Sequence, residues 1–197
     1  MEKKNVLLDV DDVICFAGFL DYANEFMNTN YEIDDIKTYY IDDTIIPQNK
    51  IKEYNKFLNS KNIYENAHIL PNAIESIKKL SEYYNIIICS ACINPYDVEN
   101  SGKYFKDKYD FLIKTLPFLK PESFIFTNTK NIIKADIQID DRVSNLVNDI
   151  PIKILFPSYH NKEIADEYLS SKNIIRAGKD WRTGWQYILD ILIKDKE

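Results

Sequence analysis

The sequence predicts a doubly wound α/β fold, a parallel sheet covered by helices, with a small helical cap inserted after the first strand. Three observations support this prediction. Short apolar, β-branched runs alternate with helical patterns along the chain. These runs are apolar on both faces, as in the central strands of a parallel sheet. One connection between two such runs is far too long to be a loop.

Six apolar runs are expected to form strands. They are Asn5–Leu8, Ile86–Ile88, Phe124–Phe126, Ile137–Ile139, Ile152–Phe156 and, as a sixth candidate, Asn173–Ile175. Between the strands, Asn72 is a suitable residue to cap a following helix. The apolar face of that helix is made by Ile74, Ile77, Leu80 and Tyr84, and that of the last helix by Trp181, Trp185, Ile188, Leu189 and Leu192.

The connection from Phe16 to Ala67 has no buried-strand pattern, but it contains aromatic-rich helical patterns. A structureless loop of about 50 residues would be unusual inside a compact domain. We therefore expect residues 18–67 to form a helical cap, and residues 1–17 together with 68–197 to form the core. A chain of 197 residues is long enough to bury one such core with a small inserted lobe.

Charge and composition exclude several classes of function. The chain has 25 Lys and Arg against 31 Asp and Glu, so its net charge of −6 repels a nucleic acid polymer. No apolar run approaches the ~20 residues that span a bilayer, and none resembles a signal peptide. We therefore expect a cytoplasmic protein with no membrane partner. Three cysteines, an odd number, argue against a disulfide framework.

Carboxylates directly follow two of the expected strands. Asp9, Asp11 and Asp12 come after the first strand, and Asp140 and Asp141 come at the end of a later one. In an open parallel sheet, ligands bind at the carboxyl ends of the strands. Two acidic clusters there repel each other unless a cation lies between them, and carboxylate oxygens suit Mg²⁺. An acidic pair can also cap a following helix, but two pairs that each end an apolar strand favour a magnesium site.

Two further residues suit the binding of an anion. Ser90 ends an apolar strand, and its hydroxyl can hold an anion together with the backbone N–H groups of the next turn. Lys130 follows the carboxyl end of another strand. Lys120 and Lys134 instead lie toward the amino ends of strands, away from the acids. We therefore expect Lys130 to be the lysine at the site.

These motifs resemble those of the haloacid dehalogenase superfamily, in which one strand ends D-x-D-x-V, a second ends in Ser or Thr, a Lys follows, and an acidic pair ends a fourth strand. More narrowly, the segments LLDVDDVICF, ILPNAIESIKKL and IIICSACINP, with Lys130 ten residues before DDR, are similar to the 5'(3')-deoxyribonucleotidases. The resemblance covers nearly the whole chain. Members often carry Gly in place of Asp12 and Thr-Ser in place of Ser90-Ala91, two departures that bear on phosphate or substrate contacts.

The resemblance implies a Mg²⁺-dependent phosphomonoesterase that hydrolyses (deoxy)nucleoside monophosphates through an aspartyl phosphate. Asp9 would be the nucleophile and Asp11 the general acid and base. The implied phosphate-binding residues are Ser90, Ala91 and Lys130, and the implied metal site is made by Asp9, the backbone carbonyl of Asp11, and the pair Asp140 and Asp141. Four aromatics would either stack on a nucleobase or pack as the core of the cap: Phe16, Phe19, Tyr39 and Tyr40.

Two other functions stay open. One is a phosphatase of another small phosphoester, such as a sugar phosphate. The other is a catalytically silent protein that binds a phosphorylated partner, although binding alone needs no nucleophile. In the leading hypothesis the partner is a small-molecule phosphate ester, a deoxynucleoside monophosphate, and the protein is a monomer or a homodimer.

Overall fold

A computed structural model describes residues 2–93, 98–146 and 149–194. Six strands form one parallel sheet in the order β5-β4-β1-β6-β7-β8. The strands are β1 (Asn5–Leu8), β4 (Asn85–Ser90), β5 (Phe124–Phe126), β6 (Ile137–Asp140), β7 (Ile152–Leu155) and β8 (Ile174–Arg176). The α/β fold and the six predicted strands are confirmed, and the strand ends differ from the prediction by at most two residues.

The centre of the sheet is buried on both faces, which explains its continuous apolar runs. Leu7 and Leu8 of β1 and Ile139 of β6 are at most 1% exposed. Leu8 lies opposite Ile88 of β4 on one side and opposite Ile139 of β6 on the other. This register places the residue after Leu8 level with the ends of both neighbouring strands, at the point where the strand order reverses.

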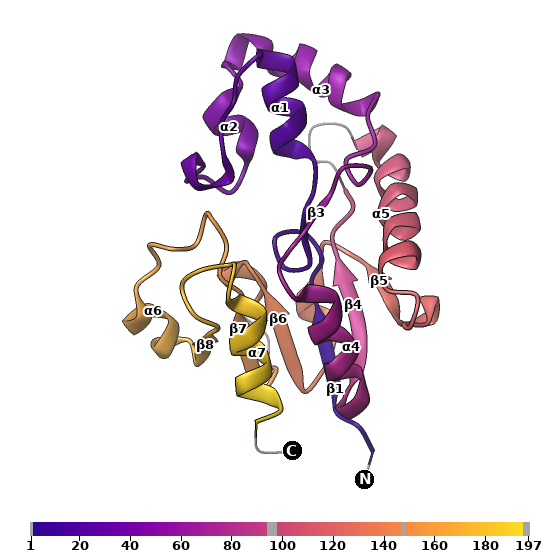
Figure 1. Cartoon of the computed structure of the whole chain (residues 1–197), viewed down its shortest axis with the longest axis vertical. Helices are drawn as coiled ribbons and strands as arrows, with labels where there is room; N and C mark the ends of the chain where they lie inside the picture. The colour runs from indigo at the N-terminus through magenta and orange to yellow at the C-terminus, as the bar shows by residue number, and fades with distance from the viewer. Residues whose placement is uncertain (1, 94–97, 147–148, 195–197) are drawn as a thin grey trace.

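One face of the sheet is covered by the helices α4 (Ala73–Tyr83) and α7 (Gly184–Leu192), which lie side by side (Figure 1). Three further helices or turns flank the sheet or its ends: α5 (Ser101–Thr115), α6 (Asp166–Ser171) and the short 3₁₀ turn η5 (Lys130–Ile132). On the other face, Leu7 and Cys89 pack against Ile150 and Ile133, which belong to connecting segments. None of the described helices is long and apolar enough to cross a membrane.

Two details of the helices differ from the prediction. Asn72 precedes α4, but its φ of 61° lies in the left-handed region and its side chain makes no capping hydrogen bond. Trp181 lies before α7 rather than on it, and its ring packs edge-on against Phe16 with centroids 5.1 Å apart. Both residues therefore belong to the segments that lead into the helices and not to the helices themselves.

Residues 18–67, which we call the helical segment, contain α1 (Phe19–Met27), η1 (Ile33–Asp35), α2 (Ile41–Ile45), η2 (Gln48–Lys50) and α3 (Ile51–Asn59). Phe26 of α1 packs against Tyr54 and Phe57 of α3, with ring centroids 5.5 and 5.4 Å apart. Figure 1 shows this segment beyond the carboxyl ends of the sheet strands. These aromatics pack among themselves, and the buried residues of the segment continue the main hydrophobic core of the sheet.

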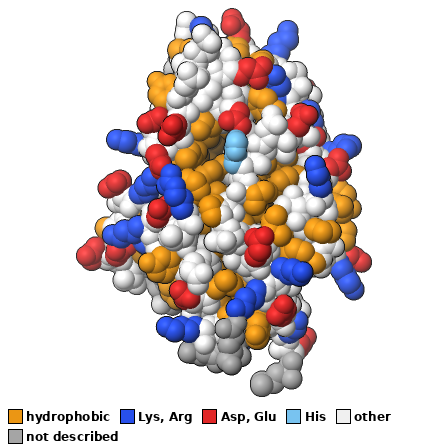
Figure 2. Space-filling model, in the orientation of Figure 1, with side chains coloured by type: hydrophobic (Ala, Val, Ile, Leu, Met, Phe, Trp, Pro, Cys, Tyr) orange, Lys and Arg blue, Asp and Glu red, His pale blue; other side chains and the backbone are white. Residues whose placement is uncertain are grey.

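An antiparallel ribbon connects the helical segment to the sheet domain. It pairs β2 (Cys15–Phe16) with β3 (His68–Ile69), and the sequence did not predict it because two residues carry no strand pattern. Figure 2 shows apolar side chains gathered at the level where the segment meets the sheet. A hollow of about 310 Å³ there is lined by Phe16, Ala17, Leu20, Asp21, Glu32, Ile33, His68 and Trp181.

Candidate active site

The two acidic clusters meet at the end of the sheet. Asp9 directly follows β1, and its backbone N–H donates to the carbonyl of Ile139 on β6 at 3.1 Å. Oxygens of Asp9, Asp140 and Asp141 lie within 4.8 Å of one another, and all three residues are buried. Burial, followed by the Asp9 carboxylate, raises the pKa of Asp140 to about 7 and that of Asp141 to about 8. Lys130 acts to lower both pKa values, yet they stay raised, so a further cation at the site would favour the ionised carboxylates.

Lys130 is the lysine that lies beside these acids. Its Nζ lies 2.7 Å from Oδ2 of Asp9 and 2.7 Å from Oδ2 of Asp140. Burial acts to lower the pKa of Lys130, but these two carboxylates outweigh burial and raise the pKa above its ordinary value. The ammonium group is therefore charged at neutral pH. Lys120 and Lys134, which the strand directions exclude from the site, are exposed.

The two acids at the end of β6 have different partners. Asp140 accepts hydrogen bonds from Lys130, from the backbone N–H of Arg142 at 2.9 Å and from Nδ2 of Asn145 at 2.9 Å. Asp141 has the imidazole of His160 beside it, with Nε2 2.7 Å from its Oδ2. Burial lowers the pKa of His160 to about 4, so this imidazole is uncharged at neutral pH. Asp140 thus accepts from three protein donors, and these hydrogen bonds hold Lys130 and the turn after β6 in place.

Asp11 lies in the turn after β1, and each of its oxygens has a donor. Tyr64 donates its hydroxyl to Oδ1 at 2.7 Å, and Lys108 donates its Nζ to Oδ2 at 2.7 Å. The same Nζ donates to Oγ of Ser90 at 2.7 Å and to the carbonyl of Ala91. Lys108 therefore connects Asp11 with the end of β4. The turn after Ser90 is described only as far as residue 93, so the predicted cradle of backbone N–H groups lies partly outside the described residues.

Lys108 and Tyr64, which both contact Asp11, were not predicted from the sequence. Lys108 is one of several lysines on α5, yet it is only 1% exposed. A signal was present, because Lys108 lies four residues from both Tyr104 and Leu112, which are buried, and so falls on the apolar face of the helix. A lysine in such a position indicates a buried charge partner. Tyr64 gave no comparable signal, since it is one of 14 tyrosines in the chain.

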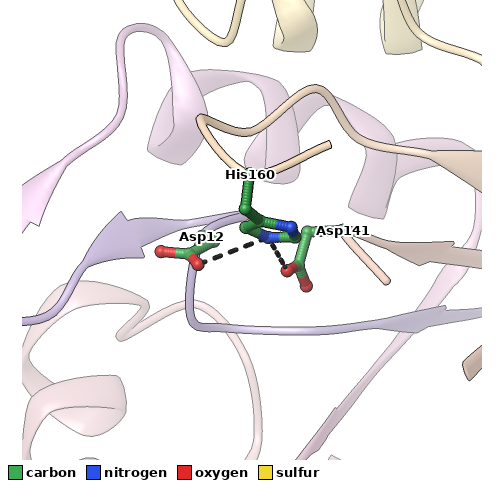
Figure 3. Close-up of side chains that lie close together, drawn as sticks. All are labelled: Asp12, Asp141 and His160. Atoms are coloured by element: carbon green, nitrogen blue, oxygen red, sulfur yellow. Dashed lines mark hydrogen bonds and ion pairs between the residues drawn. The ribbon is translucent and has the colours of Figure 1, made fainter. Parts of the chain in front are cut away.

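Asp12 adds a further carboxyl group close to the cluster of Asp9, Asp140 and Asp141. Its φ of 60° lies in the left-handed region that favours glycine. Its Oδ2 lies 3.7 Å from Nε2 of His160, on the other side of the imidazole from Asp141 (Figure 3). Burial, followed by the Asp141 carboxylate, raises the pKa of Asp12 well above its ordinary value. The departure from glycine noted in the sequence thus changes the charge environment beside Asp141.

A cavity of about 320 Å³ opens next to these residues, between the helical segment and the end of the sheet. Asp11, Ala91 and Lys108 belong to its lining. The four aromatics that the sequence singled out also line it: Phe16, Phe19, Tyr39 and Tyr40. Phe16 is only 8% exposed, whereas Tyr39 and Tyr40 are 36% and 40% exposed. The lining of the cavity therefore combines charged groups, Asp11 and Lys108, with aromatic rings that are partly exposed.

Comparisons with known proteins agree with this architecture. A family model described as 5' nucleotidase, deoxy (pyrimidine), cytosolic type C protein matches residues 3–188. A 5'(3')-deoxyribonucleotidase of Clostridium acetobutylicum is 31% identical over 184 residues, 92% of each chain. The 5'(3')-deoxyribonucleotidase of Bacillus subtilis is 25% identical over 162 residues, 81% of this chain and 88% of the other.

Solved structures show the same fold at low sequence identity. A haloacid dehalogenase-like hydrolase from Xanthomonas campestris superposes with a TM-score of 0.52 at 8% identity, over 99% of each chain. The HAD-type protein YfnB from Bacillus subtilis, solved with bound magnesium, gives a TM-score of 0.51 at 15% identity, over 98% of this chain and 100% of the other. The family model and the 31% identical relative show that the chain, which has the fold of haloacid dehalogenase-like hydrolases, belongs to the 5'(3')-deoxyribonucleotidase family of phosphatases.

Proposed function

We propose that this phosphatase hydrolyses deoxynucleoside monophosphates, uses Mg²⁺, and forms an aspartyl phosphate on Asp9. The observation that carries the proposal is the convergence of Asp9, Lys130 and Asp141 at the end of the sheet, beside a cavity that has aromatic walls. The family match and the relatives named 5'(3')-deoxyribonucleotidase support the choice of substrate.

The donor set fits a magnesium ion. Three buried carboxylates supply oxygens within 4.8 Å of one another, and Mg²⁺ prefers carboxylate oxygens combined with water. Because Asp140 already accepts from three protein donors, we assign the side-chain ligands to Asp9 and Asp141, with the backbone carbonyl of Asp11 as the third protein ligand. When bound there, Mg²⁺ would neutralise phosphate charge and favour in-line attack.

Asp9 is the nucleophile in this mechanism. One of its carboxylate oxygens attacks phosphorus, the bond from phosphorus to the ester oxygen breaks, and water later cleaves the aspartyl phosphate to release inorganic phosphate. Asp11 gives a proton to the departing ester oxygen and afterwards takes one from the attacking water. Lys130, which contacts Asp9, is placed to offset the charge that the phosphate oxygens bring to the site.

Lys108 and Ser90, which contact each other at 2.7 Å, are the further phosphate-holding residues in this proposal. In the free protein, Lys108 and Tyr64 occupy the two oxygens of Asp11. An arriving phosphate oxygen offers Lys108 a stronger anionic partner next to Ser90. Transfer of the ammonium group to the phosphate then frees one oxygen of Asp11 for the leaving group. Substrate binding and proton donation are coupled in this way.

The helical segment acts as the substrate-selecting cap, with its boundaries at the ribbon of β2 and β3. Tyr39 and Tyr40 offer exposed rings in the same cavity that contains Asp11 and Lys108. Stacking of a base on an aromatic side chain contributes ~1–3 kcal/mol. A mononucleotide with its phosphate at Lys108 would direct its base toward these rings, and we expect pyrimidines to be preferred.

The test is phosphate release from a panel of deoxynucleoside monophosphates, hexose phosphates and triose phosphates, with and without Mg²⁺. We expect Mg²⁺-dependent release, the highest kcat/KM for a deoxynucleoside monophosphate, and no release by Asp9→Asn, because an amide cannot form the acyl phosphate. Turnover by a folded Asp9→Asn variant would exclude the covalent mechanism. Turnover of sugar phosphates alone would support the same phosphatase mechanism with a different substrate. Binding of a phosphate ester without any phosphate release would support the catalytically silent binding protein.

A further inference from the structure

His160 lies outside the four motifs that the sequence identified, in the loop that follows β7. Its imidazole is 8% exposed, and Nε2 is 2.7 Å from Oδ2 of Asp141 but 3.7 Å from Oδ2 of Asp12 (Figure 3). Only the first distance is that of a hydrogen bond. When Mg²⁺ is bound at Asp141 its carboxylate is ionised and can only accept, so in that state Nε2 carries the proton and donates it to Asp141.

The loop that carries His160 is fixed to Asp141 by a second contact. Asn161, 1% exposed, donates its Nδ2 to the backbone carbonyl of Asp141 at 2.8 Å and to that of Phe156 at 2.8 Å. Its Oδ1 accepts the backbone N–H of Ser158 at 3.0 Å. Neighbouring residues of one loop thus hold both the side chain and the main chain of Asp141.

Two tyrosine rings pack against the imidazole of His160. Tyr159 and Tyr39 pack edge-on against His160, each with ring centroids 5.1 Å away and interplanar angles of 83° and 85°. The hydroxyl of Tyr159 donates to the backbone carbonyl of Tyr39 at 3.1 Å, which joins the two rings. Tyr39 comes from the helical segment, so the imidazole is held jointly by the sheet domain and this segment.

We propose that His160 is a positioning residue for the metal site, which fixes the carboxylate of Asp141 in its ligating orientation. This inference rests on the proposed Mg²⁺ function. A donor on Oδ2 restricts rotation of the carboxylate and keeps it close to Asp9 and Asp140.

A second cation bound among Asp12, Asp141 and His160 is the alternative reading of the same geometry, because their ligand atoms also lie within 4.8 Å of one another. The 2.7 Å contact from Nε2 to Asp141 has the length of a direct hydrogen bond, which favours the positioning role, with His160 as the donor once Mg²⁺ has ionised Asp141. A nitrogen that donates a proton to this carboxylate has no lone pair left for a metal. The grouping is therefore accounted for by a hydrogen bond.

The test is a calorimetric titration of Mg²⁺ into metal-free protein, which needs no substrate. His160→Leu removes the hydrogen-bond donor but keeps most of the side-chain volume, whereas His160→Ala removes both. His160→Gln restores a side-chain N–H at a similar distance from the backbone. His68→Ala is the matched control, since His68 also contacts a carboxylate, Asp21 at 2.8 Å, on the exposed surface. Removing the partner of a metal ligand typically weakens metal binding by ~10–100-fold.

We expect that increase in Kd for His160→Leu and His160→Ala, recovery of most of the affinity in His160→Gln, and no change in His68→Ala. The Mg²⁺ concentration that gives half-maximal activity should rise in parallel, while kcat at saturating Mg²⁺ stays near the parent value. A folded His160→Leu or His160→Ala variant with the parent Kd would overturn the positioning role and leave the proposed function intact. A parent protein that binds no Mg²⁺ would overturn the metal site itself, and the inference with it.

Discussion

Two buried lysines, Lys130 and Lys108, form ion pairs with different carboxylates of the site. Lys130 contacts Asp9 and Asp140, while Lys108 contacts Asp11. Both are at most 5% exposed, so removing either would leave buried carboxylates without a nearby cation. The lysines therefore set the charge of the site before any substrate binds.

This pairing leads to a prediction for Lys130. A charge-assisted contact to phosphate contributes ~1.5–3 kcal/mol, so Lys130→Ala should lower kcat/KM by at least about tenfold. Lys134→Ala should stay near the parent value, because Lys134 is exposed and lies before β6, away from the acids. Steady-state kinetics at equal folded fraction, checked by circular dichroism, measures both. The opposite pattern would mean that Lys130 serves only to hold Asp140.

Direction along a strand explains why sequence reasoning found some of these residues and not others. Asp9, Ser90 and Asp140 end or directly follow apolar strands, so their meeting follows from the parallel sheet alone. Lys108 reaches the same place from the middle of a helix, and Tyr64 from the return of the helical segment. Such positions depend on how elements pack, and a single sequence does not specify that packing.

At the scale of elements, the helical segment is tied to the sheet domain through Asp34. Oδ1 of Asp34 lies 2.7 Å from Nζ of Lys162, and Oδ2 lies 2.6 Å from Nη2 of Arg182. Hydrogen bonds from these two cations lower the pKa of Asp34 to about 2. Lys162 and Arg182 come from two different connections of the sheet domain, one after β7 and one before α7. Asp34 thus joins three parts of the chain.

We predict that Asp34→Ala loosens the helical segment without destabilising the sheet. The ion pairs are exposed, so the global free energy of unfolding should fall by less than ~1 kcal/mol. Hydrogen exchange should become faster in residues 18–67 and stay unchanged in the sheet strands. Asp110→Ala is the control, because Asp110 pairs with Lys106 within α5 alone. Equal exchange in the segment before and after the Asp34 substitution would show that other contacts hold it.

The elements differ in how far the sequence determines them. Strands buried on both faces could be located to within two residues, because an apolar run has few alternatives inside a parallel sheet. The ribbon of β2 and β3 could not, since its two-residue strands form only because the ends of the helical segment meet. Asn72 shows how far capping can be predicted from residue type. The position before α4 was predicted correctly, but Asn72 enters the helix through a left-handed backbone conformation and makes no side-chain cap.

At the scale of the whole molecule, the acidic site makes the stability of the metal-free protein depend on pH. The pKa values of Asp140 and Asp141, about 7 and about 8, lie above the ordinary value of 3.8. Each contributes stability that is fully present below 3.8 and is lost as the pH rises through its folded pKa. The pKa of His160, lowered to about 4 from 6.5, acts in the opposite direction, but only below pH 6.5.

The raised pKa of Asp12 acts in the same direction as those of Asp140 and Asp141. Between pH 6.5 and 8.5 we therefore predict that the free energy of unfolding in EDTA falls by roughly 1–3 kcal/mol. Saturating Mg²⁺ should remove most of that decrease, because the bound cation replaces the protons that the carboxyl groups release. Urea unfolding curves at four pH values, with EDTA or with Mg²⁺, measure the effect. Asp141→Asn should flatten the EDTA curve and abolish the response to Mg²⁺. An identical slope with EDTA and with Mg²⁺ in the parent protein would mean that these acids do not bind the ion.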